Sequence, residues 1–355
     1  MTRKIHTKFK DRYDQKALSN ISLIIQVVEK YYVEQLTQSQ IAKQIGVSRS
    51  TISRMLSRAR DEGIVRIQIV YPQVRHTSIE ADLRKRFNLS ETIVIALPKQ
   101  VLEEDELRSW VGIQAAPFVN QMIQSKMVIG VGRGRTLAEL AFGLSKTTNG
   151  CYDIKIVQLL GDIDIHYSPT RSTEITRLLS ESYNGEAYYL NAPALVADVN
   201  LGMTLMRSST IQQVTKFYDS LDFAMAGVGA LHNSPLVLSG LLRTSDIRKL
   251  AKAGAVGDIC GHFYDINGNL LDHVYSGISI GISWDQLHNC NKLLVTATGS
   301  DKVKPLLGLL RTGMIDILIT DEQTAQKLLS CSDTSPAPPS DSSPAGHRAA
   351  GPCRK

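Results

Sequence analysis

The chain has 355 residues, of which 43% are hydrophobic, and its formal net charge at pH 7 is +6. This length has room for a small domain and a larger one, each able to bury a core. No stretch approaches the roughly 18 consecutive apolar residues that span a bilayer, and no apolar segment follows the basic N-terminus. We therefore expect a soluble, cytoplasmic protein with no membrane partner.

The positive charge is concentrated at the N-terminal end. The first 75 residues carry 14 Lys or Arg against 6 Asp or Glu, a net charge of +8, which leaves −2 for the rest of the chain. A basic head on a slightly acidic body suggests that only the head meets a polyanion such as DNA.

The cysteines are odd in number and lie far apart, with no paired spacing and no cluster of histidines nearby. They are Cys151, Cys260, Cys290, Cys331 and Cys353. This pattern indicates small apolar fillers in a reducing compartment, and neither a zinc site nor a disulfide framework. We expect no metal and no cofactor.

The first part of the chain predicts an arm followed by a three-helix head. Residues 1–17 are polar and basic, and predict a flexible arm that either touches DNA phosphates or is simply solvated. The head spans residues 18–75 and opens with an apolar-rich helix at 18–33. Residues 64–71 predict a short strand ended by Pro72, which forms either a wing or a connector.

Within the head, residues 38–45 and 49–60 predict two helices joined by a turn at Gly46. Thr37 and Ser48 stand where their hydroxyls cap the first amides of these helices. Two short helices with a glycine turn between them indicate a helix-turn-helix, whose second helix reads the major groove of double-stranded DNA.

The second of these helices has one apolar side and one side rich in hydroxyls and guanidiniums, the groups that contact phosphates and base edges. The apolar side consists of Ile52, Met55, Leu56 and Ala59. The candidate DNA-contacting residues are Gln38, Ser48, Arg49, Ser50, Thr51, Ser53, Arg54 and Arg58. The alternative is an ordinary helical hairpin with solvated serines, although SRSTISRMLSRAR is a poor choice for helix propensity alone.

From residue 78 to residue 330, helix and strand signals alternate, which predicts a doubly wound α/β domain with a parallel sheet covered on both faces. The predicted strands are 92–97, 127–131, 154–160, 223–228, 278–282, 293–298 and 315–320. The predicted helices are 79–87, 103–125, 136–144, 172–183, 245–252, 302–310 and 322–329. Residues 331–355 are rich in Ser, Pro and Ala and predict a disordered tail.

The segment MVIGVGRGRTL at residues 127–137 predicts a strand, a glycine turn and the start of a helix. Its three glycines let the backbone approach a ligand, and the amides that open the helix point at it. Arg133, Arg135 and Thr136 add charge and a hydroxyl, so a phosphate or similar anion is the expected guest. The spacing matches neither the dinucleotide fingerprint nor a Walker loop, and a glycine turn used only for packing is the alternative.

Polar residues also follow other predicted strands, where open parallel sheets place their ligands. Among them are Asp258 and Lys302, although each such residue is more often simply part of a loop. A lysine near the phosphate loop would balance a second anionic or hydroxylated end of a sugar. The histidines that we considered as acid or base groups are His166, His232, His262 and His273, and they are scattered. We therefore predict no catalytic residue.

Taken together, the order of parts resembles the SorC family of bacterial sugar-responsive transcriptional regulators, from about residue 18 to residue 329. The segments that carry the resemblance are LTQSQIAKQIGVSRSTISRMLSRARDEGIVRI, IGVGRGRTL, SLDFAMAGVGA, AGAVGDICGHFYDINGNLLD and LLGLLRTGMIDILITDEQTAQKLL. The resemblance implies a winged helix-turn-helix head, and an effector domain related to sugar-phosphate isomerases and deaminases. It also implies a homodimer or homotetramer that senses a phosphorylated sugar or polyol.

By position, the resemblance implies a set of effector-binding residues. The phosphate loop falls on Gly132, Gly134, Arg135 and Thr136, and the acidic and basic contacts fall on Asp258 and Lys302. We expect a regulator of a carbohydrate-utilisation operon whose operator affinity is set by this effector, and no enzymatic activity. Two alternatives are a sugar-phosphate isomerase or deaminase that carries a DNA-binding head, and an effector domain that serves only to oligomerise.

Overall fold

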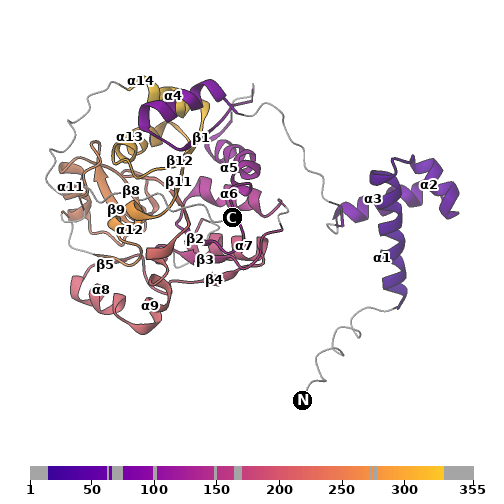
Figure 1. Ribbon diagram of the computed structural model, residues 1–355, viewed down its shortest axis with the longest axis horizontal. Coiled ribbons are helices and arrows are strands. Elements are labelled where there is room, and N and C mark those ends of the chain that lie inside the picture. Colours follow the sequence, from indigo (N-terminus) through magenta and orange to yellow (C-terminus); the bar gives the residue numbers. More distant parts are fainter. Residues whose placement is uncertain are drawn as a thin grey trace, which may run out of the picture. The chain divides into compact units, whose positions relative to one another are not determined.

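The computed structural model describes residues 15–61, 64–65, 75–98, 102–147, 150–163, 170–271, 274 and 278–331, with only the backbone for 15–20 and 61. The chain divides into a head, Met1–Pro72, and a body, Gln73–Lys355 (Figure 1). Residues 1–14 of the predicted arm and 332–355 of the predicted tail lie outside the described residues, as does most of the predicted strand 64–71.

The head consists of three helices around a small apolar core. They are α1 (Gln15–Val28), which continues into a π-helical turn η1 (Glu29–Val33), α2 (Gln38–Ile45) and α3 (Arg49–Asp61). The buried cluster consists of Val27, Ile41, Ala42, Ile52 and Leu56. The first helix begins at Gln15, a few residues before the start of the helix predicted at 18–33.

Local capping explains where the two helices of the motif begin and end. The amide of Gln40 donates to the hydroxyl of Thr37 at 3.3 Å, and the side-chain oxygen of Gln40 accepts from the amide of Thr37 at 2.9 Å. Gly46 ends α2 with a φ of +79°, in the left-handed region that glycine adopts without strain. The amide of Thr51 donates to the Ser48 hydroxyl at 3.1 Å, which caps α3.

The body is built on a seven-stranded parallel sheet in the order β1-β12-β11-β6-β2-β3-β4. Its strands are β1 (Glu91–Ile95), β2 (Val128–Val131), β3 (Lys155–Gln158), β4 (Glu186–Tyr188), β6 (Phe223–Gly227), β11 (Leu293–Thr296) and β12 (Ile317–Asp321). The chain winds outward from β2 to β4 on one side and from β6 to β12 on the other. Neighbouring β2 and β6 therefore form the switch point at which parallel sheets bind ligands.

Helices cover both faces of this sheet (Figure 1). One face carries α5 (Glu104–Asn120), α6 (Arg135–Leu144) and α7 (Ser172–Ser182). The other carries α4 (Thr77–Phe87), α9 (Ser209–Thr215), α12 (Trp284–Asn289), α13 (Val303–Arg311) and α14 (Glu322–Ser330). Strand β1 shows why both faces are apolar: Ile93 and Ile95 belong to one core and Val94 to the other. The predicted doubly wound α/β fold is confirmed.

A smaller layer extends from the end of the sheet that holds the switch point. Its antiparallel sheet has the order β7-β8-β9, and β5 pairs with β10 beside it. These strands are β5 (Leu195–Val196), β7 (Gly229–Ala230), β8 (Ala255–Ile259), β9 (His262–Asp265) and β10 (Ile278–Ser279). The remaining helices are α8 (Val199–Met206), α10 (Pro235–Leu238), α11 (Thr244–Lys252) and the 3-10 turns η2 (Tyr218–Ser220) and η4 (Ser300–Lys302). The sequence did not predict β4, β5 or the β7-β8-β9 sheet.

One predicted strand is wrong in its length and in its sheet. Of residues 278–282, Ile278–Ser279 form β10, which pairs antiparallel with β5 and does not join the parallel sheet. Ile280 and Ile282 are buried in the core between these layers, and a Cβ at Gly281 would lie 2.3 Å from the carbonyl oxygen of Leu159. A buried loop produces the same short apolar run as a buried strand, so periodicity does not separate them.

The other predicted elements of the body are present, and their ends agree within two residues, except that the helix predicted at 103–125 ends at Asn120. Ser125 lies beyond that end, where a loop leads to β2. In the part of the chain that the structure describes, no helix is both long and apolar enough to cross a membrane.

Candidate functional site

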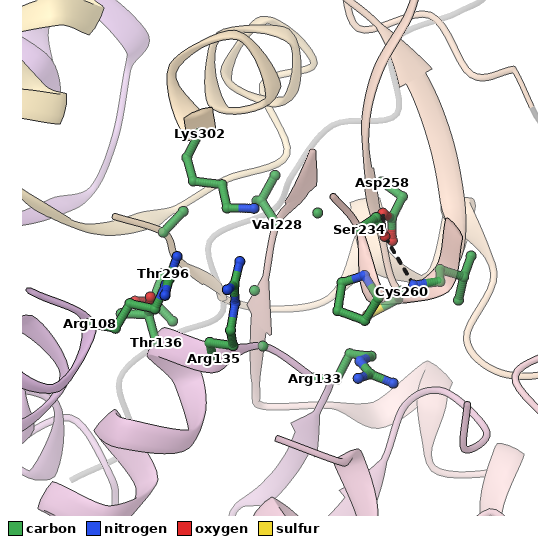
Figure 2. Close-up of a pocket in the computed structure, with 16 residues that line it drawn as sticks. Arg108, Arg133, Arg135, Thr136, Val228, Ser234, Asp258, Cys260, Thr296 and Lys302 are labelled. Carbon is green, nitrogen blue, oxygen red and sulfur yellow. Dashed lines mark hydrogen bonds between the residues drawn. The ribbon is translucent and has the colours of Figure 1, made fainter. Parts of the chain in front are cut away.

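A hollow opens at the carboxyl edge of the parallel sheet, where β2 and β6 end side by side (Figure 2). Its wall is formed by the loop from β2 into α6, the ends of β6 and β11, β8, η4 and one side chain from α5. It is partly open to solvent, and the side chains of Arg108, Arg133, Arg135 and Lys302 lie in its wall.

The glycines of the β2–α6 loop bring backbone against backbone. Gly134 has a φ of +154°, and a Cβ there would lie 3.0 Å from the Cα of Gly227. The loop therefore lies directly on the end of β6, and Gly134 lines the hollow. Gly132 does not line it, and a Cβ added to Gly132 would lie 3.1 Å from the Cys260 sulfur. Gly130 is packed in the same way against Leu159.

Helix α6 begins at the floor of the hollow. Its first intrahelical bond runs from the amide of Ala138 to the carbonyl of Gly134 at 2.9 Å, so the preceding amides of the first turn have no acceptor within the helix. Thr136 is buried, and its hydroxyl lies 3.3 Å from that of Thr298. The Arg135 side chain points into the hollow (Figure 2). A helix start with a cation beside it favours an anion.

Asp258 supplies the acidic wall. It lies on β8, is 8% exposed and accepts a hydrogen bond of 2.5 Å from the hydroxyl of Ser234. Burial raises the pKa of Asp258 above its ordinary value, while the Ser234 hydrogen bond and the charges of Lys302, Arg133 and His262 act in the opposite direction. The side chain can therefore accept hydrogen bonds from hydroxyl groups of a guest.

Lys302 lies across the hollow from this carboxylate, at the end of η4. It is 7% exposed, and its ammonium lies 3.4 Å from a carboxylate oxygen of Asp301. Burial lowers the pKa of Lys302, and Asp301 partly offsets that effect. Burial also acts to raise the pKa of Asp301, but the hydrogen bond from Asn233 and the charge of Lys302 outweigh it, so that pKa is lowered. Lys302 is thus held in place by an ionised neighbour.

Arg108 is a wall residue that the sequence analysis missed. It comes from α5, its side chain is 5% exposed, and it lines the hollow beside Thr136 and Thr296 (Figure 2). It donates to Glu104 at 2.5 Å and to Asp105. Acids three and four residues away make such an arginine resemble an ordinary surface ion pair, so the sequence carried no signal for it.

Three smaller side chains of the wall were also missed, namely Ser234, Cys260 and Thr296. Cys260 is buried, which together with the charge of Asp258 raises the pKa of its thiol to about 12. It is therefore a neutral wall residue at physiological pH. The hydroxyl of Thr296 is buried and has no hydrogen-bond partner among the described residues, so it is available to a guest.

Five of the six effector residues expected from the sequence come together around the hollow. They are Gly134, Arg135, Thr136, Asp258 and Lys302. The sixth, Gly132, lies behind the wall. The structure thus brings together residues that are up to 168 positions apart in the chain, and their roles in binding remain predictions.

The candidate DNA-contacting residues lie on α3 or directly before it, except Gln38, which is the first residue of α2. Ser48, Arg49, Ser50, Ser53, Arg54 and Arg58 are exposed, and Gln38 and Thr51 are half-buried. The Ser48 hydroxyl lies 2.8 Å from those of both Ser50 and Thr51. These hydroxyls therefore order the start of α3, and they remain at the surface beside the guanidiniums. The opposite side of α3 is buried as predicted, except that Met55 is half-buried.

Comparison with known proteins finds relatives for both the head and the body. Residues 71–330 match a family described as putative sugar-binding domain, and residues 26–62 match region 4 of sigma-70. The chain is 30% identical over 315 residues to the sorbitol operon regulator of Klebsiella pneumoniae, covering 87% of this chain and 98% of that protein. It is 26% identical over 308 residues to the deoxyribonucleoside regulator of Bacillus subtilis, covering 86% and 97%.

The full-length crystal structure of the K. pneumoniae sorbitol operon regulator SorC is similar to this fold as well. The TM-score is 0.70 at 28% sequence identity, and the match covers 90% of this chain and 100% of that one. The chain belongs to the SorC family. It is a DNA-binding transcriptional regulator with a helix-turn-helix head and a sugar-binding domain, as its homologues are.

In this SorC-family regulator, none of the histidines that the structure describes lines the hollow. His262 lies behind the wall, where its Nε2 is 2.8 Å from the carbonyl oxygen of Ile282. His232 is exposed and lies at a different surface depression. His166 and His273 lie outside the described residues. Among the residues that the structure describes, no group of three or more His, Cys, Asp or Glu could hold a metal ion.

Proposed function

We propose that a phosphorylated sugar or sugar alcohol binds in the hollow and sets the affinity of the head for an operator of a carbohydrate-utilisation operon. The observation that carries this proposal is the charge of the wall. Arg108, Arg133, Arg135 and Lys302 line the hollow together with the N-terminus of α6, and Asp258 is the acidic residue among the described wall residues. An unphosphorylated sugar offers no anion to such a wall.

The two sides of the hollow suit the two parts of such a ligand. The phosphate would accept hydrogen bonds from the amides that open α6, from the Thr136 hydroxyl and from the Arg135 guanidinium. The hydroxylated chain would then extend toward Asp258, which is held by Ser234. Lys302 would bind a further hydroxyl or a second anionic group at the far end.

The names of the relatives support a ligand of this class. Relatives include the sorbitol operon regulator of K. pneumoniae and the deoxyribonucleoside regulator of B. subtilis. A third, 24% identical over 311 residues, is the erythritol catabolism regulatory protein of Brucella abortus. Two of these three names refer to sugar alcohols, so acyclic polyol phosphates belong beside aldose phosphates in any search for the effector.

On the DNA side, we propose that Arg49 and Arg54 contact backbone phosphates or guanine edges, with Ser50, Thr51 and Ser53 beside them. A single recognition helix reads only a half-site, so a homodimer or homotetramer would place two heads on half-sites about one or more helical turns apart. The effector acts by binding DNA-competent and incompetent arrangements with different affinity, typically by about 1 to 3 kcal/mol.

A ligand screen on the full-length protein tests the binding half of this proposal. The panel pairs each phosphorylated compound with its unphosphorylated form, beginning with sorbitol 6-phosphate and sorbitol, then deoxyribose 5-phosphate and deoxyribose. We expect only phosphorylated members to raise the melting temperature, because a ligand at 100 times its Kd adds roughly 2.7 kcal/mol.

The matched variant for this screen is Arg135→Gln, which removes a cation from the wall and keeps the helix start. We expect it to abolish the shift given by the active compound. Its control is Arg177→Gln, because Arg177 is exposed on α7 and pairs only with Glu174 and Glu181 among the contacts described. A panel with no active member would favour the alternative that the effector domain only oligomerises. Turnover of a panel member would favour the enzyme.

A further inference from the structure

Arg75 is the first described residue of the body, and it is held from several sides. Its guanidinium donates to both carboxylate oxygens of Glu80 at 2.7 and 2.8 Å, to Glu91 at 2.9 Å and to the carbonyl of Thr92 at 2.8 Å. Glu80 is 1% exposed and also accepts from the amide of Val94 at 2.9 Å. The point where the chain enters the body is therefore fixed to both α4 and β1.

Helix α5 provides a further contact of Arg75. The ring of Phe118, near the end of α5, lies under the guanidinium at 4.9 Å from its carbon to the ring centroid, a cation–π arrangement. Residues 66–74 connect Arg75 to the DNA-reading head. A displacement of α5 would therefore act on the residue from which the covalent connection to the head departs.

The same helix reaches the effector hollow at its other end. Arg108 lies in the wall of the hollow and is bound to Glu104 and Asp105, whose side chains are 76% and 90% exposed. An anion in the hollow would compete for Arg108 with these two well-solvated carboxylates. Arg108 and Phe118 are ten residues apart, which is about 15 Å along a helix.

Close glycine contacts join α5 to α6, the helix whose N-terminus forms the anion-binding end of the hollow. A Cβ on Gly112 of α5 would lie 2.6 Å from the Cβ of Glu139, and one on Gly143 of α6 would lie 2.7 Å from the Cβ of Ala116. The two helices run side by side over the same face of the sheet (Figure 1). Packing this tight transmits a displacement of either helix to the other.

We propose that α5 carries the signal from the occupied hollow to the DNA-reading head, with Phe118 and Arg75 as positioning residues at the receiving end. This inference rests on the proposed function. Neither Phe118 nor Arg75 lines the hollow, so neither contacts the effector, and both act through the helix and the chain that they connect. Loss of their contact leaves both binding sites intact and removes the link between them.

The test compares Phe118→Leu with a matched control, Phe142→Leu. Phe142 lies on α6, is 45% exposed and has the ammonium of Lys146 at 4.7 Å from its ring centroid. It is thus a cation–π pair on the same two-helix unit that does not involve Arg75. A second variant, Arg75→Lys, keeps the charge and loses the bidentate bond to Glu80, and it carries the test if Phe118→Leu shows no cooperative unfolding.

Two quantities are measured on each full-length protein with sorbitol 6-phosphate, deoxyribose 5-phosphate and fructose 6-phosphate as probes. The first is the Kd of each probe by calorimetry. The second concerns a fluorescent DNA duplex that has been selected from random DNA with the wild-type protein. The Kd of each protein for this duplex is measured with and without saturating probe, and the ratio of the two Kd values is compared. A purely structural role for Phe118 would lower stability without changing this ratio.

We expect the wild type and Phe142→Leu to show the same ratio, within the typical range of about 5 to 150. Phe118→Leu and Arg75→Lys should bind the active probe nearly as well as the wild type and show a ratio close to 1. If Phe118→Leu shows the same ratio as the wild type, the inference is wrong but the proposed function is not affected. The same holds for Arg75→Lys when that variant replaces Phe118→Leu in the test. A wild type whose DNA affinity responds to none of the probes contradicts both.

Discussion

The hydroxyl of Ser234 donates a hydrogen bond of 2.5 Å to Asp258, and so positions the carboxylate of a wall that otherwise carries four cationic side chains. Such a carboxylate accepts hydrogen bonds from hydroxyl groups and repels anions. We therefore expect the hollow to distinguish a hydroxylated phosphate ester from a bare anion, and we expect Asp258 to make that distinction.

Replacement of Asp258 by Asn separates these two effects. We expect Asp258→Asn to weaken binding of the active sugar phosphate by about tenfold or more, because hydrogen bonds to a charged group contribute about 1.5 to 3 kcal/mol. Binding of sulfate should become tighter, because the repelling charge is gone. Calorimetry measures the affinity of each protein for the sugar phosphate and for sulfate. An equal loss of affinity for both compounds would show that Asp258 only supports the fold.

The raised pKa of Asp258 also predicts how stability depends on pH. Burial raises its pKa in the native protein above the unfolded value of about 3.9. The native state thus binds more protons than the unfolded state between these two pKa values. The contribution of Asp258 to the free energy of unfolding is therefore fully present below the unfolded pKa. It is lost as the pH rises through the native pKa.

Asp258→Asn should therefore gain stability relative to the wild type as the pH is raised through the native pKa. Urea unfolding of both proteins between pH 4 and pH 8 measures this difference. Asp222→Asn serves as the control, because Asp222 lies outside the hollow, where its carboxylate accepts a hydrogen bond of 2.9 Å from the amide of Val128. A stability difference between Asp258→Asn and wild type that stays constant with pH would contradict the raised pKa.

The sequence could predict the parts of this structure that depend on local pattern. The capped helices around Gly46 and the parallel strands followed by short loops have clear periodic signals, and the resemblance to the SorC family indicated Asp258 and Lys302 as ligand candidates. The effector hollow as a whole, however, is made by tertiary packing. Arg108 reaches it only because α5 crosses beside α6, and no spacing in the sequence records that neighbour.

The misassigned segment at residues 278–282 shows the same limit. Ile280 and Ile282 are buried in the chain that follows β10, and burial of a loop and burial of a strand select the same side chains. The β7-β8-β9 sheet was missed for a related reason: β7 has two residues and β8 contains Gly257, so neither shows an alternating pattern. Pairing with distant neighbours, and not local preference, makes them strands.

The backbone of the β2–α6 loop gives a third prediction. Gly134→Ala should destabilise the body by about 1 to 3 kcal/mol, because alanine rarely adopts a φ of +154° and its Cβ would lie 3.0 Å from Gly227. Gly150→Ala is the matched control, since a Cβ there meets nothing within 4 Å. Chemical denaturation measures both proteins. Similar midpoints for the two variants would show that the loop relaxes without cost.

The recognition helix gives a fourth prediction. Arg54→Ala should weaken DNA binding, and, if the guanidinium contacts a phosphate, it should lower the slope of log K against log salt by about 0.9. Lys30→Ala is the control in the same head, because Lys30 lies in η1 and pairs with Glu34 at 3.7 Å. Fluorescence anisotropy over a salt series measures both. An Arg54→Ala protein that binds the duplex as tightly as the wild type would exclude Arg54 from the interface.

The central claim is that an anion in the body controls the affinity of the head for DNA. It is tested most directly by the Kd of the full-length protein for its selected duplex, measured with a sugar alcohol phosphate, with the same sugar alcohol lacking phosphate, and with neither. The account predicts that for at least one such pair the phosphorylated compound changes the Kd by about fivefold or more while its unphosphorylated partner leaves it unchanged. Equal effects of both forms, or no effect of either across the panel, would contradict it.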